Sequence, residues 1–300
     1  MFLQQLINGI SLGSIYALIA LGYTMVYGIV LLINFAHGDV LMAGAYAAYF
    51  ALTWLSAGNA DSVSMGALAG AFIFSMTFCA FLGVCIERFA YRPLRSAPRL
   101  NSLITAIAVS LILQNGARVL PFIGPNPRQF PRPPVSAISL GPVSISNIQL
   151  IVIALSAILM LALNYVINYT RRGKAMQAVS FDLQASSLMG VSVNGVISFT
   201  FALGSILAAA GGILYACAYP QISPTMGTMP GLKAFVAAVL GGIGSVPGAM
   251  LGGLLLGIAE TLTKGFISSQ YADAISFSIL IVILLVKPSG ILGKKTGVKV

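Results

Sequence analysis

The sequence is poor in charge of either sign. Of its 300 residues, 7% are Asp, Glu, Lys or Arg, whereas 58% are hydrophobic. Soluble globular chains carry about 25% charged residues, so this composition excludes a soluble protein. The polar intervals are too short to fold on their own. We therefore predict an all-α fold, a polytopic membrane helix bundle in which residues 1–300 form a single transmembrane domain.

Residue types that enzymes use are scarce as well. The sequence contains one histidine, six acidic residues and three cysteines. Cys79, Cys85 and Cys217 stand in apolar stretches without the spacing of a metal site or a disulfide framework, so we interpret them as packing residues. No glycine-rich loop ends in Lys-Ser or Lys-Thr, as phosphate-binding loops do. We expect no catalytic residue, no metal site and no cofactor bound by this chain, and thus no enzyme.

Positive charges outnumber negative ones, which gives a net charge of +10. They stand in short loops beside apolar runs and not along an aromatic-rich stripe, which indicates a lipid bilayer and not nucleic acid as the partner. Lys and Arg are enriched in cytoplasmic loops, so we assign to the cytoplasm the segments that carry most of them. These residues are Arg88, Arg92, Arg95, Arg99, Arg171, Arg172, Lys174, Lys287, Lys294, Lys295 and Lys299.

Apolar runs of about 17–25 residues, the length that crosses a bilayer, occur eight times. They cover roughly residues 3–21, 38–57, 66–87, 100–120, 148–169, 193–218, 247–265 and 271–287. Two shorter apolar runs, 22–35 and 230–243, raise the number of spans to ten if both cross. Either even number places the two termini on the same side. Together with the basic loops, this predicts a multi-pass membrane protein with both termini in the cytoplasm.

The first interrupted region is 22–44, where Asn34, His37 and Asp39 stand among apolar residues. An Asp at the centre of a span costs about 2.5–3.5 kcal/mol, so protein or water must satisfy it. His37 is placed to cap the turn or to pair with Asp39. We favour a polar turn at the cytoplasmic end of a span, with Asp39 beginning the next helix, over a role of Asp39 in lining a path. The path candidates of this region are Gly22, Asn34, His37 and Asp39.

The second interrupted region is 227–253, which contains the sequence GGIGSVPG. A helix broken there exposes backbone groups that must face protein or a watery cavity. Interrupted segments in both halves of a transporter point to its translocation region. The path candidates here are Gly241, Gly242, Gly244 and Pro247, and close helix packing is the alternative explanation for the glycines. Glu260 and Lys264, four residues apart, are predicted to pair near the end of a span.

The segment 171–191, RRGKAMQAVSFDLQASSLMGV, is the longest polar interval with a helical pattern. Met176, Val179 and Leu183 recur at three- and four-residue spacing, which predicts one amphipathic helix that ends at Gly190. A short helix between spans has nothing of its own to cover this apolar stripe. It would be stable against a groove supplied by another protein. The alternative is a helix that lies on lipid headgroups.

These motifs resemble a known family, the membrane permeases of branched-chain amino acid ABC transporters, and specifically the smaller permease subunit. GYTMVYGIVLLINFAHGDVLMAGAY is similar to the opening signature of that family, and KAFVAAVLGGIGSVPGAMLGGLLLGIAE to its C-terminal signature. RRGKAMQAVSFDLQASSLMGVSV resembles its cytoplasmic coupling segment, and KPSGILGKK its ending. The resemblance covers essentially the whole chain.

The resemblance implies a permease in a bacterial inner membrane that forms a heterodimer with a second permease subunit. It also implies two cytoplasmic ATPase subunits that bind ATP, and a periplasmic protein that delivers leucine, isoleucine or valine. The coupling pattern of ABC importers is Glu-Ala-Ala, three residues, then Gly; here Gln184 replaces the acid and Ser186 an alanine. The residues expected to couple to the ATPase are Lys174, Gln177, Asp182, Gln184, Ala185, Ser186 and Gly190.

Two other functions stay open at this point. A permease for urea or short amides has the same architecture, and nothing in the sequence fixes the cargo. An ion-coupled secondary transporter is the other alternative, and it needs titratable groups at mid-membrane. The candidates for such groups are His37, Asp39 and Glu260.

Overall fold

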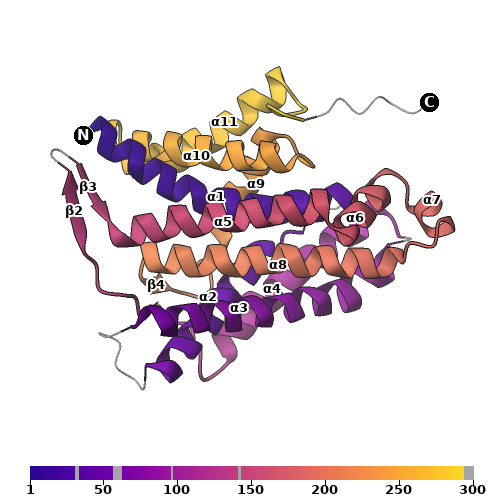
Figure 1. Cartoon of the computed structure of the whole chain (residues 1–300), viewed down its shortest axis with the longest axis horizontal. Coiled ribbons are helices and arrows are strands. Elements are labelled where there is room, and N and C mark those ends of the chain that lie inside the picture. The colour runs from indigo at the N-terminus through magenta and orange to yellow at the C-terminus, as the bar shows by residue number, and fades with distance from the viewer. Residues whose placement is uncertain (31–33, 57–62, 96, 141–142, 294–300) are drawn as a thin grey trace.

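The computed structural model describes residues 1–30, 34–56, 63–95, 97–140 and 143–293. Most of them are helical, and the long helices run side by side along one axis (Figure 1). The α-helices are α1 (Phe2–Val30), α2 (His37–Leu55), α3 (Met65–Ile86), α4 (Arg99–Val119), α5 (Asn147–Tyr169), α6 (Arg171–Phe181), α7 (Leu183–Leu188), α8 (Val193–Ala218), α9 (Thr228–Gly241), α10 (Val246–Phe266) and α11 (Ala272–Val286). Helix α3 continues into a π-helical turn, Glu87–Tyr91, and a 3-10 turn, Arg92–Leu94.

Four short strands complete the described fold. Strands β2 (Ala137–Leu140) and β3 (Val143–Ser146) form an antiparallel hairpin, and β1 (Arg128–Gln129) pairs antiparallel with β4 (Gln221–Ile222). They gather at one end of the bundle, which we call the strand end (Figure 1). Helices α6 and α7 lie at the opposite end, which we call the α7 end.

The predicted all-α membrane bundle is confirmed. Within the described residues, seven helical segments are long and apolar enough to cross a membrane. They contain α1, α3, α4, α5, α8, α10 and α11. The remaining predicted run, 38–57, forms α2, whose 19 residues include the polar His37 and Asp39. Each of the eight long apolar runs therefore corresponds to one helix.

Helix α1 corrects the prediction of a separate short segment at 22–35. Its 29 residues continue without a break to Val30 and extend for about 43 Å at 1.5 Å per residue. The helix continues through Gly22. Packing explains the glycine, since a Cβ there would lie 2.4 Å from His37 Nε2 and 3.0 Å from Gly204 O. Of the run 22–35, residues 31–33 lie outside the described part of the chain.

Small residues allow the central helices to pack closely. Helix α1 runs against α10, where a Cβ on Gly257 would lie 2.3 Å from the Cα of Gly13, and one on Gly253 would lie 2.4 Å from the Cα of Ala17. Close backbone approach of this kind drives helix association in lipid, where no hydrophobic force acts between helices. Helix α1 is thereby enclosed by other helices and forms the centre of the bundle.

The first residues of α1 and residues 287–293 lie at opposite ends of the described bundle, whereas the sequence predicts both termini on one side; the side of the membrane that each terminus faces stays a prediction. Near the N-terminus, Gln4 Nε2 donates to Ser144 O of β3 at 2.9 Å, at the strand end. Residues 287–293 lie at the other end, where Ile291 N donates to Leu240 O at 2.9 Å. Lys294, Lys295 and Lys299 lie outside the described residues.

Candidate functional site

Two helices begin inside the bundle instead of at its ends. Helix α2 starts at His37, and His37 packs on Gly22, which in turn contacts Gly204 near the middle of α8. Helix α9 starts at Thr228, and the preceding Gly227 touches Gly38: a Cβ on Gly227 would lie 1.8 Å from Gly38 O. The first turns of α2 and α9 therefore meet near mid-depth, one from each half of the chain.

Asn34 organises the turn that leads into α2. Its side-chain oxygen accepts from Ala36 N at 3.1 Å and from Tyr91 Oη at 2.9 Å, and its carbonyl accepts from His37 N at 3.1 Å. Non-helical backbone inside a membrane requires such protein partners. The predicted polar turn is thus present between the end of α1 and the start of α2, and its position relative to a membrane stays a prediction.

A cavity of about 180 Å³ opens where the two first turns meet. One water molecule needs roughly 10–15 Å³, so the space admits more than isolated water. Helices α1, α2, α4 and α9 contribute its walls. The lining residues are Tyr23, Phe35, Gly38, Asp39, Ile107, Ser110, Gln114, Gly227, Thr228, Gly231 and Leu232.

Asp39 brings a carboxylate to this cavity. It lies in the first turn of α2, as predicted, and its side chain is buried, with an exposed fraction of 2%. Gln114 Nε2 of α4 donates to Asp39 Oδ1 at 2.9 Å. A helix N-terminus stabilises an anion by about 0.3–1 kcal/mol and a hydrogen bond to a charged group by about 1.5–3 kcal/mol. Together these match the cost of about 2.5–3.5 kcal/mol for a mid-membrane Asp.

His37 has a separate place in the structure. It is buried, and its ring lies 4.6 Å from that of Tyr23. Its Nε2 has no hydrogen-bond partner among the described residues, and no hydrogen bond joins it to Asp39 there. The suggested pairing of His37 with Asp39 is therefore not what the structure contains. His37 instead fills the space that Gly22 leaves open.

The GGIGSVPG break lies far from this cavity, at the α7 end. Helix α9 ends at Gly241. The next two glycines, Gly242 and Gly244, adopt positive φ angles of 105° and 91°. Ser245 then caps α10, because its Oγ accepts from Gly248 N at 3.2 Å. Pro247 occupies the first turn of α10, where no hydrogen bond is lost. The predicted break is confirmed. Within region 227–253, however, the residues that line the mid-depth cavity lie at the start of the region, between Gly227 and Leu232.

The backbone groups that this break exposes are satisfied within the chain. Ile291 N and Leu292 N donate to the carbonyls of Leu240 and Gly241, both at 2.9 Å. A Cβ on Gly241 would lie 1.9 Å from Gly248 O, so this glycine is required by packing. Gly244 has open space around its Cα and needs glycine for its φ angle. A role of these residues in lining a path stays a prediction.

The predicted coupling segment 171–191 forms two helices instead of one. Asp182 breaks it with an extended φ of −155° and caps α7, because its Oδ1 accepts from Gln184 N at 2.8 Å and Ala185 N at 3.0 Å. Gly190 ends α7 with a φ of 81°, as predicted, and Val191 N donates to Ser186 O at 3.0 Å. This is the Schellman pattern at a helix end.

The apolar stripe of this segment is covered by the chain itself. Met176 and Val179 of α6 are buried against the bundle, which corrects the expectation that nothing in the chain covers them. Gln177 Nε2 also ties α6 to α5 by donating to Ile167 O at 3.2 Å. The exposed apolar residues are instead Phe181, Leu183, Leu188 and Met189, around α7. Lys174, Gln184, Ala185 and Gly190 are exposed, while Ser186 is buried.

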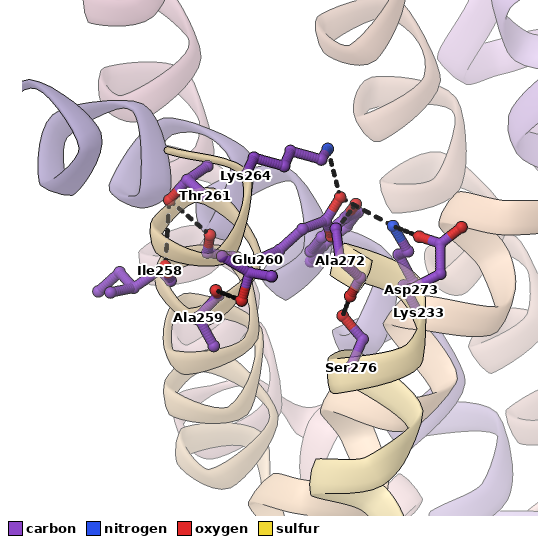
Figure 2. A network of polar contacts seen from close by, with 12 residues as sticks. Lys233, Ile258, Ala259, Glu260, Thr261, Lys264, Ala272, Asp273 and Ser276 are labelled. Carbon is purple, nitrogen blue, oxygen red and sulfur yellow. Dashed lines mark hydrogen bonds and ion pairs between the residues drawn. The ribbon is translucent and has the colours of Figure 1, made fainter. Parts of the chain in front are cut away.

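A buried ion network near the strand end extends the predicted Glu260–Lys264 pair (Figure 2). Glu260 is 1% exposed and accepts from Lys264 Nζ at 2.6 Å, Lys233 Nζ at 2.8 Å and Tyr16 Oη at 2.9 Å. Lys233 also pairs with Asp273 Oδ1 at 2.6 Å. The sequence reasoning missed Lys233, although a lone lysine in the apolar run 230–243 is itself a signal of a buried partner. Nothing in the sequence pointed to Gln114.

The bundle of apolar helices, with two helices that start at mid-depth beside a cavity, defines a multi-pass membrane transport protein. The sequence profile of the family described as "Branched-chain amino acid transport system / permease component" matches residues 5–284. The chain belongs to this family.

Relatives support the same assignment over the full length. The chain is 44% identical to the high-affinity branched-chain amino acid transport system permease protein BraD of Pseudomonas aeruginosa, with 100% of this chain and 98% of BraD covered. It is 45% identical to the corresponding permease protein LivH of Escherichia coli K12, with the same coverage. A ribose import permease protein, RbsC of Escherichia coli K12, is 30% identical over 43% of this chain and 42% of its own length. No solved structure matches the chain.

Proposed function

We propose that this chain is the permease subunit of an ATP-driven importer for leucine, isoleucine and valine in a bacterial inner membrane. The observation that carries the proposal is the match over 100% of the chain to permease proteins of high-affinity branched-chain amino acid systems. The chain itself binds no ATP and no cofactor. A second permease subunit completes the translocation path, and a periplasmic binding protein delivers the cargo.

Two cytoplasmic ATPase subunits supply the energy, and one of them docks on this chain at α7. Helix α7 projects from the end of the bundle (Figure 1). Around it, Phe181, Leu188 and Met189 are 83%, 88% and 84% exposed. Apolar side chains exposed together on a short helix fit a groove on a partner protein. Because α6 is anchored in the bundle, a displacement of α7 reaches the transmembrane helices.

The charge distribution supports a cytoplasmic α7 end. Arg171, Arg172 and Lys174 belong to α6, and Arg92 and Arg95 follow α3. Arg95 Nη1 donates to Asn194 Oδ1 beside α7, which joins the two basic segments at the same end. Lys and Arg are enriched on the cytoplasmic side. The C-terminus is therefore proposed to be cytoplasmic and the N-terminus external.

The alternatives have less support. The similarity to a ribose import permease means that this architecture does not by itself set the cargo, but the full-length relatives are amino acid permeases. An ion-coupled transporter needs a titratable group that is free to change its charge. Of the three candidates, Glu260 does not meet this need, because it is held by two lysines and a tyrosine. Against the alternative as a whole stand the full-length relatives, which are permease proteins of amino acid transport systems.

The test is uptake by proteoliposomes that contain the intact complex with its binding protein. We expect ATP-dependent uptake of radiolabelled leucine that is competed by isoleucine and valine but not by urea. Omission of the ATPase subunits is the control, and uptake should then stop. Urea uptake without leucine uptake would refute the cargo, and uptake driven by a proton or sodium gradient without ATPase would refute the mechanism.

A further inference from the structure

We propose that Asp39 binds the α-ammonium group of the transported amino acid inside the mid-depth cavity. The inference rests on the proposed function, because it names the group of the cargo that this chain recognises. It also gives Asp39 a role beyond beginning α2.

The first argument is charge. Asp39 is 2% exposed, and among the described residues no Lys, Arg or His forms an ion pair with it. This distinguishes it from Glu87 and Glu260, which are also buried but are neutralised by Arg95 and by two lysines. A buried carboxylate that lines a cavity and has no cation of its own is a site for a cationic ligand.

The second argument is open hydrogen-bonding capacity. A carboxylate has about four lone-pair positions. Gln114 Nε2 uses one of them at 2.9 Å, and the Ser110 hydroxyl interacts with the same carboxylate and uses a second. Gln114 Nε2 also lies 3.3 Å from Ser110 Oγ, so its amide is held in place by α4. An ammonium group has three donors and fits the remaining positions. Gln114 and Ser110 then act as positioning residues for the carboxylate.

The third argument is the composition of the other walls. Ile107, Leu232 and Phe35 give the cavity an apolar side that suits a branched aliphatic side chain. Gly227 and Thr228, at the N-terminus of the 14-residue α9, line it as well. A helix N-terminus favours an anion such as the cargo carboxylate. The cavity thus offers an acid, a positive helix end and an apolar wall. These complement the ammonium group, the carboxylate and the aliphatic side chain of a branched amino acid.

Urea fits this arrangement poorly. It carries no charge, so a buried carboxylate without a counter-ion would gain no ionic partner from it. The inference therefore favours an amino acid over a neutral amide as the cargo.

The experiment compares Asp39→Asn with wild type in the reconstituted complex. Asn keeps the size of the side chain and an oxygen for Gln114, but it removes the charge. We expect leucine uptake to fall at least tenfold, while the amount of assembled complex stays within twofold of wild type. Asp273→Asn, a half-exposed acid that does not line the cavity, is the matched control and should retain uptake.

The outcomes separate the inference from the proposed function. If wild type imports leucine and Asp39→Asn imports it equally well, Asp39 is a structural residue and the inference is wrong. If wild type imports no amino acid, the proposed function fails, and the inference fails with it.

A second measurement covers the case in which Asp39→Asn does not assemble. Ile107→Cys places a thiol on the cavity wall and leaves Asp39, Gln114 and Ser110 intact. We expect a cationic thiosulfonate reagent to modify it at least tenfold faster than an anionic one, after correction for their rates with a free thiol and for the native cysteines. Equal corrected rates would overturn the inference.

Discussion

At the residue scale, glycine makes the meeting of α2 and α9 possible. Gly38, Gly227 and Gly231 lie backbone to backbone, and a Cβ on Gly231 would lie 2.9 Å from the Cα of Gly38. This contact brings the first turns of both helices to the same cavity as Asp39. Larger side chains would separate the helices, so the site depends on residues that carry no chemistry themselves.

We predict that Gly227→Ala destabilises the protein by about 1–3 kcal/mol, the usual cost of overpacking, because its Cβ would lie 1.8 Å from Gly38 O. Thermal unfolding of the purified protein in detergent measures this. Gly116→Ala is the control, since no atom lies within 4 Å of its added Cβ. Ala has a higher helix propensity than Gly, so Gly116→Ala should keep or raise stability. An equal loss in both variants would show that the close contact at Gly227 is not the cause.

Glu260 gives a second prediction at this scale. Glu260→Gln leaves the buried ammonium of Lys233 with Asp273 alone, so we expect a loss of about 3 kcal/mol, as for other broken buried pairs. Lys264→Met is the control: Lys264 is 39% exposed, and its loss should cost less than about 1 kcal/mol. Thermal unfolding compares the two variants. Equal losses would contradict a structural role that depends on burial.

At the scale of elements, the coupling segment divides into an anchor and a projection. Helix α6 buries Met176 and Val179 and is tied to α5 through Gln177. Helix α7 is set at an angle to it by Asp182 and ended by Gly190. Because α6 is fixed to the bundle, a displacement of α7 by a docked partner is passed on to the transmembrane helices. A single helix lying on lipid would move without displacing them.

We predict that the double substitution Leu188→Glu and Met189→Glu abolishes ATPase docking, because charge replaces the apolar surface that the partner covers. Co-purification of the ATPase subunits with the tagged permease is the measurement. Ile138→Glu places a charge on a residue that is 53% exposed at the opposite end, and it should leave co-purification unchanged. Normal docking of the double variant would refute the assignment of α7.

Gly190 and Asp182 belong to the same prediction. Gly190→Val forces a β-branched residue to a φ of 81°, and Asp182→Lys removes the cap of α7. Both variants should insert normally and lose leucine-stimulated ATP hydrolysis. If both hydrolyse ATP and transport as wild type does, the shape of α7 is not what couples the subunits.

At the scale of the whole molecule, α2 and α9 both begin inside the bundle, and this changes the topology that the apolar runs predict. The chain returns from the end of α1 to mid-depth before α2 leaves toward the strand end, where the ring of Phe50 lies 5.9 Å from that of Phe122. Helix α9 starts at mid-depth and ends at the α7 end. With α2 and α9 each counted as one crossing, the proposed topology has the two termini on opposite sides of the membrane.

We predict that an N-terminal reporter is external and a C-terminal reporter cytoplasmic. Fusions to a reporter that is active only outside the cytoplasm, read in intact cells, measure this. A fusion in the stretch between α4 and β1 serves as the external control, because β1 lies at the strand end. Reporters that respond alike at the two termini would contradict the arrangement of the bundle.

The apolar runs and the basic loops were sufficient to predict the class of fold and the position of each long helix. The resemblance of GYTMVYGIVLLINFAHGDVLMAGAY and KAFVAAVLGGIGSVPGAMLGGLLLGIAE to permease signatures predicted the family, which the full-length relatives confirm. What could not be predicted was which interrupted segments share a cavity: Asp39 lines it together with Gly227, whereas the GGIGSVPG break lies at the α7 end. Hydropathy counts apolar residues but does not say where a short segment lies across the bilayer.

The sequence by itself determined that this is a helical membrane protein, because the cost of exposing apolar side chains to water is a property of composition. It also determined where α7 ends, since Gly190 acts on its own neighbours, whereas the break at Asp182 was not predicted. Only the tertiary structure decided that Asp39 and Gln114, 75 residues apart, share a cavity with Gly227. Contacts between distant segments depend on how glycine-lined helices cross, and that geometry is set by all the helices packing together.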